Sequence, residues 1–92
     1  MKEISPNKLN FRNEIAYEIN SHTPFTGYVI KHYDDGEMYY KNCYKDGQLE
    51  GESISYYSSG QWKAKVNYKK GEPNGPYEFY YENGQLRSKG EY

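Results

Sequence analysis

Tyrosines and lysines at repeated positions are the residues of this chain best suited to recognition chemistry. The 92 residues include 13 tyrosines. Aromatic rings beside basic side chains can bind a peptide, a lipid headgroup or a carbohydrate, because ring faces attract cations and offer apolar area. The competing interpretation is that tyrosine only forms the core of a thin sheet. We predict a partner-binding surface from residues that recur every 24 positions: Tyr33, Tyr57, Tyr81, Lys41, Lys65 and Lys89.

Residues of the kinds that catalyse reactions or bind metal ions are present but are not grouped. His22 and His32 are ten positions apart, and Cys43, the single cysteine, has no recognisable base near it in the sequence. Asp34 and Asp35 could form a cation site, but aspartate is also typical of turns, which it stabilises by local hydrogen bonds. Zinc sites need several His or Cys ligands at set spacings. The sequence therefore predicts no catalytic residues, no metal site, no cofactor and no enzymatic activity.

The composition narrows the class of protein. Basic and acidic side chains are nearly balanced, at 12 and 13, and this disfavours nucleic acid as a partner because nucleic-acid-binding domains are usually clearly basic. Hydrophobic residues are 35% of the chain, and much of that share is tyrosine. The sequence shows neither an apolar leader nor a run of about 20 apolar residues that could cross a membrane. We therefore expect a cytoplasmic protein of one domain with a thin core.

A repeat of 24 residues organises the chain from residue 27 onwards. Glycine marks the start of each unit, and the units cover 27–50, 51–74 and 75–92. A Tyr-x-x-Gly motif occurs twice in each of the first two units. Repeats of this length are typical of elongated proteins in which each unit contacts mainly its neighbours.

Each unit is predicted to be a β-hairpin. The glycine that ends Tyr-x-x-Gly favours a turn, because glycine adopts the positive φ angles that other residues resist. Between the turns lie runs rich in Tyr, Val, Ile and Phe, which favour strands, and no apolar stripe of helical period is present. The predicted strands are 27–33, 37–44, 51–57, 61–68, 75–81 and 85–92.

The expected fold is all-β, with about three repeated hairpins in an elongated, single-layer antiparallel meander sheet. We expect an N-terminal capping strand at roughly 11–19, because an open sheet edge invites unwanted pairing. Residues 1–10 are expected to be a flexible segment, and residues 11–92 to form a single domain.

Alternation along the strands predicts which side chains share a face. Even-numbered residues should lie together across each hairpin, and we expect theirs to be the packed face. Met38, Trp62 and Leu86 occupy equivalent positions and should form a continuous row there. The odd-numbered face would then carry both the tyrosine column and the lysine column of the predicted partner-binding surface.

Residues 80–88, Tyr-Tyr-Glu-Asn-Gly-Gln-Leu-Arg-Ser, carry a motif that recurs at 56–62 and, more loosely, at 32–38. The motif resembles the MORN repeat (membrane occupation and recognition nexus), in the variant found in bacterial proteins. Pro-Phe-Thr-Gly at 24–27 resembles the segment that commonly precedes the first repeat. The resemblance covers about residues 24–92 and implies a row of β-hairpins in an elongated sheet. The chain also resembles the YwqK family of antitoxin components, which implies binding to a toxin protein.

The leading hypothesis is a non-enzymatic protein–protein interaction module with an antitoxin-like role. One alternative is association with phospholipid at a membrane surface. Another is a structural role as a fragment of a longer repeat array. We also expect self-association through edge strands of the sheet, since an unpaired edge offers free backbone groups.

Overall fold

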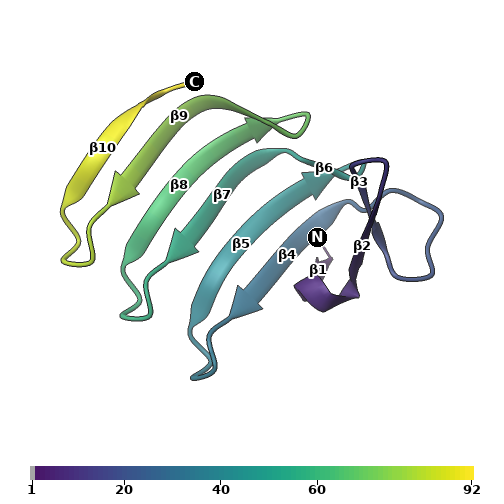
Figure 1. The fold of residues 1–92 in the computed structure, drawn as a ribbon, viewed down its shortest axis with the longest axis horizontal. Coiled ribbons are helices and arrows are strands. Elements are labelled where there is room, and N and C mark those ends of the chain that lie inside the picture. The colour runs from purple at the N-terminus through teal and green to yellow at the C-terminus, as the bar shows by residue number, and fades with distance from the viewer. Residues whose placement is uncertain (1) are drawn as a thin grey trace.

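The fold is a curved row of strands, seen in a computed structural model that describes residues 2–92 (Figure 1). Its elements are β1 (Glu3–Ile4), the 3₁₀ helix η1 (Pro6–Lys8), β2 (Leu9–Arg12), β3 (Ile15–Glu18), β4 (Gly27–His32), β5 (Met38–Lys45), β6 (Gln48–Leu49), β7 (Gly51–Tyr56), β8 (Trp62–Lys69), β9 (Glu72–Tyr80) and β10 (Leu86–Glu91). The main sheet has the order β1-β4-β5-β7-β8-β9-β10, and β6 pairs with β5. The molecule measures 42 × 33 × 21 Å. The predicted all-β sheet of repeated hairpins is confirmed.

The three long hairpins, β4–β5, β7–β8 and β9–β10, are closed by the same turn. In the first, the Gly36 N–H donates to the Tyr33 carbonyl at 2.9 Å, and the Tyr33 N–H donates to the Glu37 carbonyl at 2.7 Å. Gly36 has a φ of 91°, which a residue with a side chain adopts only with strain. The same bonds recur around Gly60 and Gly84. The turn predicted from Tyr-x-x-Gly is confirmed.

A tighter turn joins the other strand pairs. Asp46 and Gly47, with φ angles of 50° and 81°, connect β5 to β6. Lys70 and Gly71, with φ angles of 51° and 82°, connect β8 to β9. Two central residues with positive φ are the signature of a type I′ hairpin. Because this turn is so short, β9 begins at Glu72 rather than at residue 75.

The N-terminal part differs from the prediction in the position of its strands. The region expected to be one strand, 11–19, is interrupted by a two-residue turn at Asn13 and Glu14, whose φ angles are 51° and 67°. It contributes to the separate two-stranded sheet of β2 and β3. A capping strand is present, but it is β1, which pairs in parallel with β4. The flexibility of residues 1–10 stays a prediction, and Met1 lies outside the described residues.

Each long hairpin carries one extra residue in its second strand. His32 is opposite Met38 but Lys31 is opposite Tyr40, so Tyr39 between them has no partner in the ladder. Equivalent shifts leave residues 63 and 87 unpaired in the other two hairpins. Such a β-bulge reverses the alternation of side chains beyond it. The predicted even-numbered face is therefore wrong beyond the bulge in every hairpin.

The sheet accordingly has two faces that differ from the predicted ones. We call the side of the sheet that carries Lys41, Lys65 and Lys89 the lysine face. The opposite side, which carries Val29 and Tyr40, is called the lid face. Ala16 of the hairpin β2–β3 packs with Val29 and Tyr44 of the first long hairpin on this face, and no described element forms a second layer over the strands from β7 to β10 (Figure 1).

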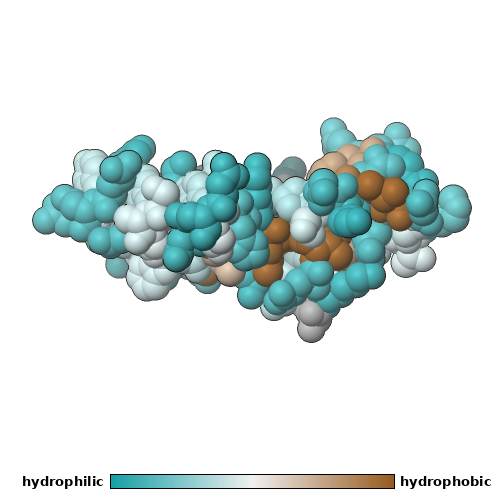
Figure 2. Space-filling view, turned by 90° about the horizontal axis from the view of Figure 1, so that it is seen from below, coloured by the Kyte–Doolittle hydropathy of each residue, from teal (hydrophilic) through white to brown (hydrophobic). Residues whose placement is uncertain are grey.

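The hydrophobic core lies between this N-terminal hairpin and the lid face. Ala16, Phe25, Val29 and Tyr44 are buried, with at most 8% of their surface exposed. The backbone holds the two parts together as well, since the Ala16 N–H donates to the Gly47 carbonyl at 2.9 Å. Figure 2 shows the most hydrophobic surface gathered at this end of the molecule, while the remainder is hydrophilic or intermediate.

The row of Met38, Trp62 and Leu86, predicted to be packed, lies before the bulges on the lysine face. Trp62 and Leu86 are 47% and 48% exposed. The prediction that they form the core is wrong, because in the described residues no second layer covers the lysine face. The core is confined to the place where the N-terminal hairpin provides one.

Candidate partner-binding surface

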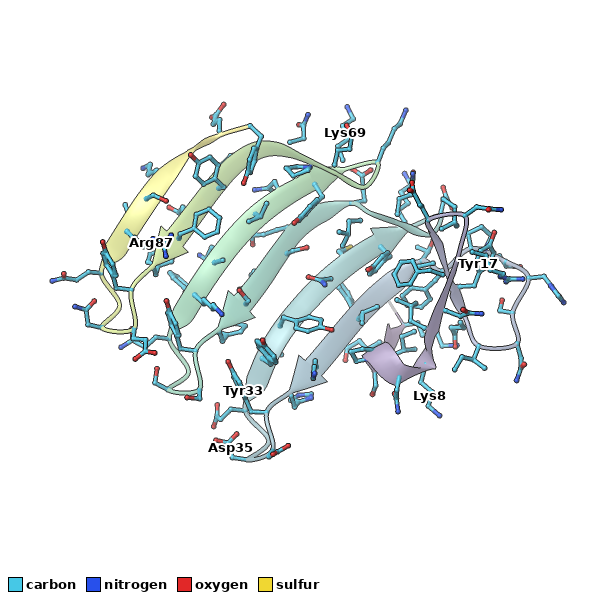
Figure 3. All side chains as sticks on the ribbon, in the orientation of Figure 1. Lys8, Tyr17, Tyr33, Asp35, Lys69 and Arg87 are labelled. Carbon is cyan, nitrogen blue, oxygen red and sulfur yellow. The ribbon has the colours of Figure 1, made fainter. Side chains whose placement is uncertain are left out.

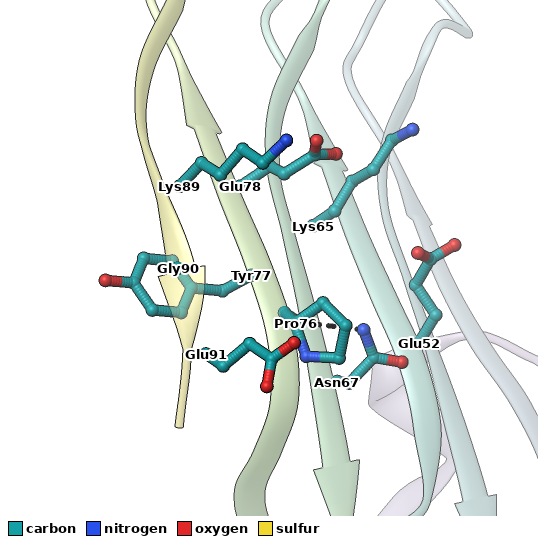
Figure 4. Close-up of a pocket in the computed structure, with 9 residues that line it drawn as sticks. All are labelled: Glu52, Lys65, Asn67, Pro76, Tyr77, Glu78, Lys89, Gly90 and Glu91. Carbon is teal, nitrogen blue, oxygen red and sulfur yellow. Dashed lines mark hydrogen bonds between the residues drawn. The ribbon is translucent and has the colours of Figure 1, made fainter.

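The three predicted lysines lie in one straight row across the lysine face. Successive cross-strand partners form a ladder over six strands: Ile30, Lys41, Ile54, Lys65, Glu78 and Lys89. Neighbouring strands are about 4.8 Å apart, so the lysines recur about every 10 Å. Figure 4 shows Lys65, Glu78 and Lys89 side by side on three adjacent strands. The structure therefore aligns this half of the predicted surface.

An open hollow of about 350 Å³ borders the lysine row on β8, β9 and β10. Its lining places Lys65 and Lys89 among the carboxylates of Glu52, Glu78 and Glu91. Because both signs of charge alternate there, the surface suits a partner that carries both signs more than a simple polyanion. Opposite charges on neighbouring strands also reduce the local positive potential.

A proline in the same hollow is accommodated by a side-chain hydrogen bond. Pro76 in β9 has no N–H, and the backbone ladder between β8 and β9 shifts register beside it. The Asn67 side-chain amide donates to the Pro76 carbonyl at 2.8 Å instead, shown dashed in Figure 4. This contact gives the Pro76 carbonyl a hydrogen-bond donor where the regular backbone ladder between β8 and β9 is interrupted.

Aromatic rings and lysines do meet on the lysine face. The Lys41 Nζ lies 4.1 Å from the centre of the Tyr28 ring, and the Lys65 Nζ lies 3.3 Å from the centre of the Trp62 ring. Such cation–π contacts are worth about 0.5–1 kcal/mol at exposed sites. The pairing of lysine with aromatic rings is therefore present, but with Tyr28 and Trp62 in place of the predicted tyrosines.

The predicted tyrosine column joins successive hairpins to one another. The Tyr33 hydroxyl donates to the backbone carbonyl of Tyr56 at 2.7 Å, and the Tyr57 hydroxyl donates to that of Tyr80 at 2.8 Å. Tyr81, at the equivalent position in the last hairpin, is 51% exposed. Two of the three tyrosines are thus engaged in structure, in agreement with the competing interpretation.

This column lies on the lid face, opposite the lysine row. Tyr33 stacks on the bulge residue Tyr39 with ring centres 4.6 Å apart, and the Lys63 Nζ lies 5.8 Å from the centre of the Tyr57 ring. Figure 3 shows Tyr33 close to the end of the first long hairpin, near Asp35. The structure does not bring the predicted tyrosines and lysines together, because the bulge between them changes the face.

Trp62, like Leu86, is an exposed residue that sequence reasoning assigned to the core. Its ring centre lies 5.7 Å from that of Tyr80, and both rings border a hollow of about 390 Å³ between the turns of the second and third long hairpins. Trp and Tyr are the residues most often found at binding hot spots. The sequence did carry a signal of the bulge, since the second predicted strand of each unit is one residue longer than the first.

Cys43 lies on the lysine face opposite Tyr28 and is half-buried. Burial raises the pKa of its thiol, Lys41 acts to lower it, and Glu50 adds to the rise. A raised pKa keeps the thiol protonated near neutral pH, whereas nucleophilic cysteines have a lowered one. The environment is that of a structural thiol.

Of the acidic pair at the first turn, Asp35 stabilises the turn by a local hydrogen bond. The Asp35 Oδ1 accepts a hydrogen bond from the Glu37 N–H at 2.9 Å, and Asn83 makes the same bond to Gln85 at 2.9 Å. His32 is exposed at the end of β4. Over residues 2–92, no three His, Cys, Asp or Glu side chains gather in a way that could hold a metal ion.

Comparison with known protein families matches residues 49–70 and 73–92 to the MORN repeat variant. These two segments therefore carry MORN repeats, and repeats of this family are non-catalytic modules that generally interact with proteins or membranes. No curated protein and no solved structure matches the chain. Within the described part of the chain, no helix is long and apolar enough to cross a membrane.

Proposed function

We propose that this chain, with its MORN repeats, is a non-enzymatic interaction module that binds a partner protein on the lysine face. The observation that carries the proposal is the exposure of Trp62. This ring is half exposed on a single-layer sheet, with Tyr80 beside it and the Lys65 ammonium over it. Covering an aromatic ring of this size stabilises a complex by removing apolar area from water.

The character of the surface defines the kind of partner. Trp62, Tyr80 and Leu86 offer apolar area near the turns, and the lysine ladder with its glutamates offers both signs of charge further along the strands. A folded protein with an apolar projection and a charged rim fits this arrangement. The resemblance to antitoxin components supports a toxin as that protein, with this chain acting as its inhibitor by binding.

Site-specific photo-crosslinking in cells that produce the protein tests the proposal. The variant Trp62→p-benzoylphenylalanine places a photoreactive ring in the centre of the surface. The matched control, Phe11→p-benzoylphenylalanine, places it on the N-terminal hairpin, where Phe11 is 56% exposed. We expect one protein to be crosslinked from position 62 and not from position 11, and crosslinking to be lost when Lys65→Glu is added.

The antitoxin-like role has its own readout. If the crosslinked protein is a toxin, its production alone should stop growth, and co-production of this chain should restore it. Trp62→Ala should weaken that rescue, while Phe11→Ala should not.

In the crosslinking experiment, equal crosslinking from positions 62 and 11 would contradict the proposal that the partner binds at Trp62.

The row of lysines supports phospholipid binding as a second candidate function. Lysines about 10 Å apart on one face could meet anionic headgroups, although the neighbouring glutamates oppose this. Sedimentation with phosphatidylserine vesicles at low salt separates the candidates. Binding that is lost in Lys65→Glu and at high salt would favour lipid, whereas full recovery in the supernatant would favour the protein partner.

A further inference from the structure

β10 is a long edge strand that no described element covers. It is the last strand of the main sheet and pairs with β9 on one side only. The opposite edge of the sheet is protected, because β1 pairs with β4 there. An uncovered edge presents free N–H and C=O groups that can pair with another strand.

The backbone groups of Lys89 and Glu91 are the ones that point outward. The Tyr92 N–H donates inward to the Gly75 carbonyl at 2.9 Å. Alternation then directs Gly90 inward and leaves Lys89 and Glu91 facing out. The repeat supports this assignment, since Cys43, equivalent to Glu91, accepts a bond from the Glu50 N–H on the outward side of β5 at 2.9 Å.

We propose that this edge pairs in antiparallel fashion with β10 of a second copy of the chain, placing Lys89 opposite Glu91 of the second copy. A two-fold axis at Gly90 creates this register and repeats the contact, so that Glu91 faces Lys89 of the second copy. All four outward-facing residues then pair through their backbones.

Charge selects this register over its neighbours. In a shifted register, Lys89 would lie opposite Lys89 of the second copy, or Glu91 opposite Glu91 of the second copy. Either shift places like charges directly across the interface, which destabilises strand pairing. In the proposed register both cross-strand pairs are of opposite charge. Their side chains lie on the same face of the sheet, as Figure 4 shows for Lys89 beside Glu78.

The flanking residues are compatible with a strand at this position. Tyr92 is 58% exposed, and its ring centre lies 4.8 Å from that of Tyr77 on the lid face. In the proposed register it lies opposite Ser88 of the second copy, a small side chain that leaves room for the ring. Only residues 88–92 overlap, so the association is expected to be weak and transient.

Sedimentation equilibrium of the whole chain, from about 10 µM to about 1 mM, tests the proposal in the range of weak association. We expect a monomer–dimer equilibrium for the native sequence. Lys89→Glu should weaken dimerisation at least tenfold, because glutamates would face each other. The double variant Lys89→Glu, Glu91→Lys exchanges the two charges and should restore the dimer. Lys65→Glu, on the same face but inside the sheet, should leave it unchanged.

Amide hydrogen exchange provides a second readout that does not depend on charge. The Lys89 and Glu91 amides should exchange more slowly at high protein concentration, while the Gly90 amide should not change. A strict monomer over the whole range would overturn the proposal. So would a double variant that stays as weak as Lys89→Glu alone, or equal slowing of exchange at Gly90.

Discussion

The hydroxyl of Tyr57 donates a hydrogen bond to the backbone carbonyl of Tyr80, at 2.8 Å. These residues belong to different hairpins, so the bond ties one repeat to the next. Tyr33 makes the same bond to Tyr56. In a sheet that is one layer thick over most of its length, contacts between neighbouring hairpins replace much of what a core would supply.

Removal of this hydroxyl should destabilise the protein. Tyr57→Phe is expected to lower the free energy of unfolding by about 0.5–1.5 kcal/mol, the usual contribution of one such bond. Tyr81→Phe is the matched control, because Tyr81 has the equivalent position but is exposed, and its change should stay within about 0.5 kcal/mol. Urea denaturation followed by tryptophan fluorescence measures both. Equal losses would contradict the prediction, because they would show that the bond from Tyr57 to Tyr80 contributes nothing beyond the loss of an exposed hydroxyl.

Gly47 and Gly71 form a second matched pair. Their φ angles are 81° and 82°, so alanine should cost about 1–2 kcal/mol of backbone strain at either position. A methyl group at Gly47 would also clash with the Ile15 side chain, whereas the nearest atom at Gly71 is the Gln48 Cβ at 3.9 Å.

We therefore expect Gly47→Ala to lower the free energy of unfolding by about 1–3 kcal/mol more than Gly71→Ala does, owing to overpacking. Denaturant unfolding of both variants gives the difference. Equal losses of unfolding free energy in the two variants would contradict the packing of Ile15 in the N-terminal hairpin against the turn at Gly47.

Trp62 and Tyr44 contrast an exposed ring with a buried one. Trp62 is 47% exposed and Tyr44 is 8% exposed. We expect Trp62→Ala to cost about 1–2 kcal/mol and Tyr44→Ala about 3–5 kcal/mol, because only the second leaves a cavity in a core. Thermal and urea unfolding would both report this order. A cost at Trp62 as large as that at Tyr44 would place Trp62 in a packed layer.

Stability should fall at alkaline pH through tyrosine ionisation. Burial raises the pKa of Tyr33, Tyr40, Tyr44 and Tyr80 above their ordinary value, which is about 10. The folded state therefore holds these protons more tightly than the unfolded state does. The stabilisation is complete below about pH 10 and is lost as the pH rises through the folded-state pKa values.

Absorbance of tyrosinate near 295 nm checks this directly. The native chain should ionise at higher pH than the same chain in urea, and urea denaturation midpoints should decrease above about pH 10. Identical titration curves for the native and unfolded chains would contradict the burial of these rings.

The hairpins could be predicted because their signals are local. Gly36, Gly60 and Gly84 fix the turns by residue type, and the alignment of the three lysines follows from the repeat alone. The faces were predicted wrongly, because a bulge is a backbone feature and the residues that occupy it, Tyr39, Lys63 and Arg87, share no chemistry. Its one trace in the sequence is the extra residue in the second predicted strand of each unit. The turn that splits the N-terminal strand was missed for a related reason, since Asn13 and Glu14 include no glycine.

Because each hairpin contains one bulge, the sheet keeps its two faces only when residues are added or removed as whole 24-residue units. Each hairpin reverses its side-chain alternation once and returns to the starting phase at the next glycine, so whole units can be inserted or removed without changing what either face displays. A single-residue deletion at position 63 would instead exchange the two faces over the rest of β8 and move Lys65 to the side of the lid. The protein can therefore lengthen its binding surface only in complete hairpins, each of which adds another aligned position beside those of Lys41, Lys65 and Lys89.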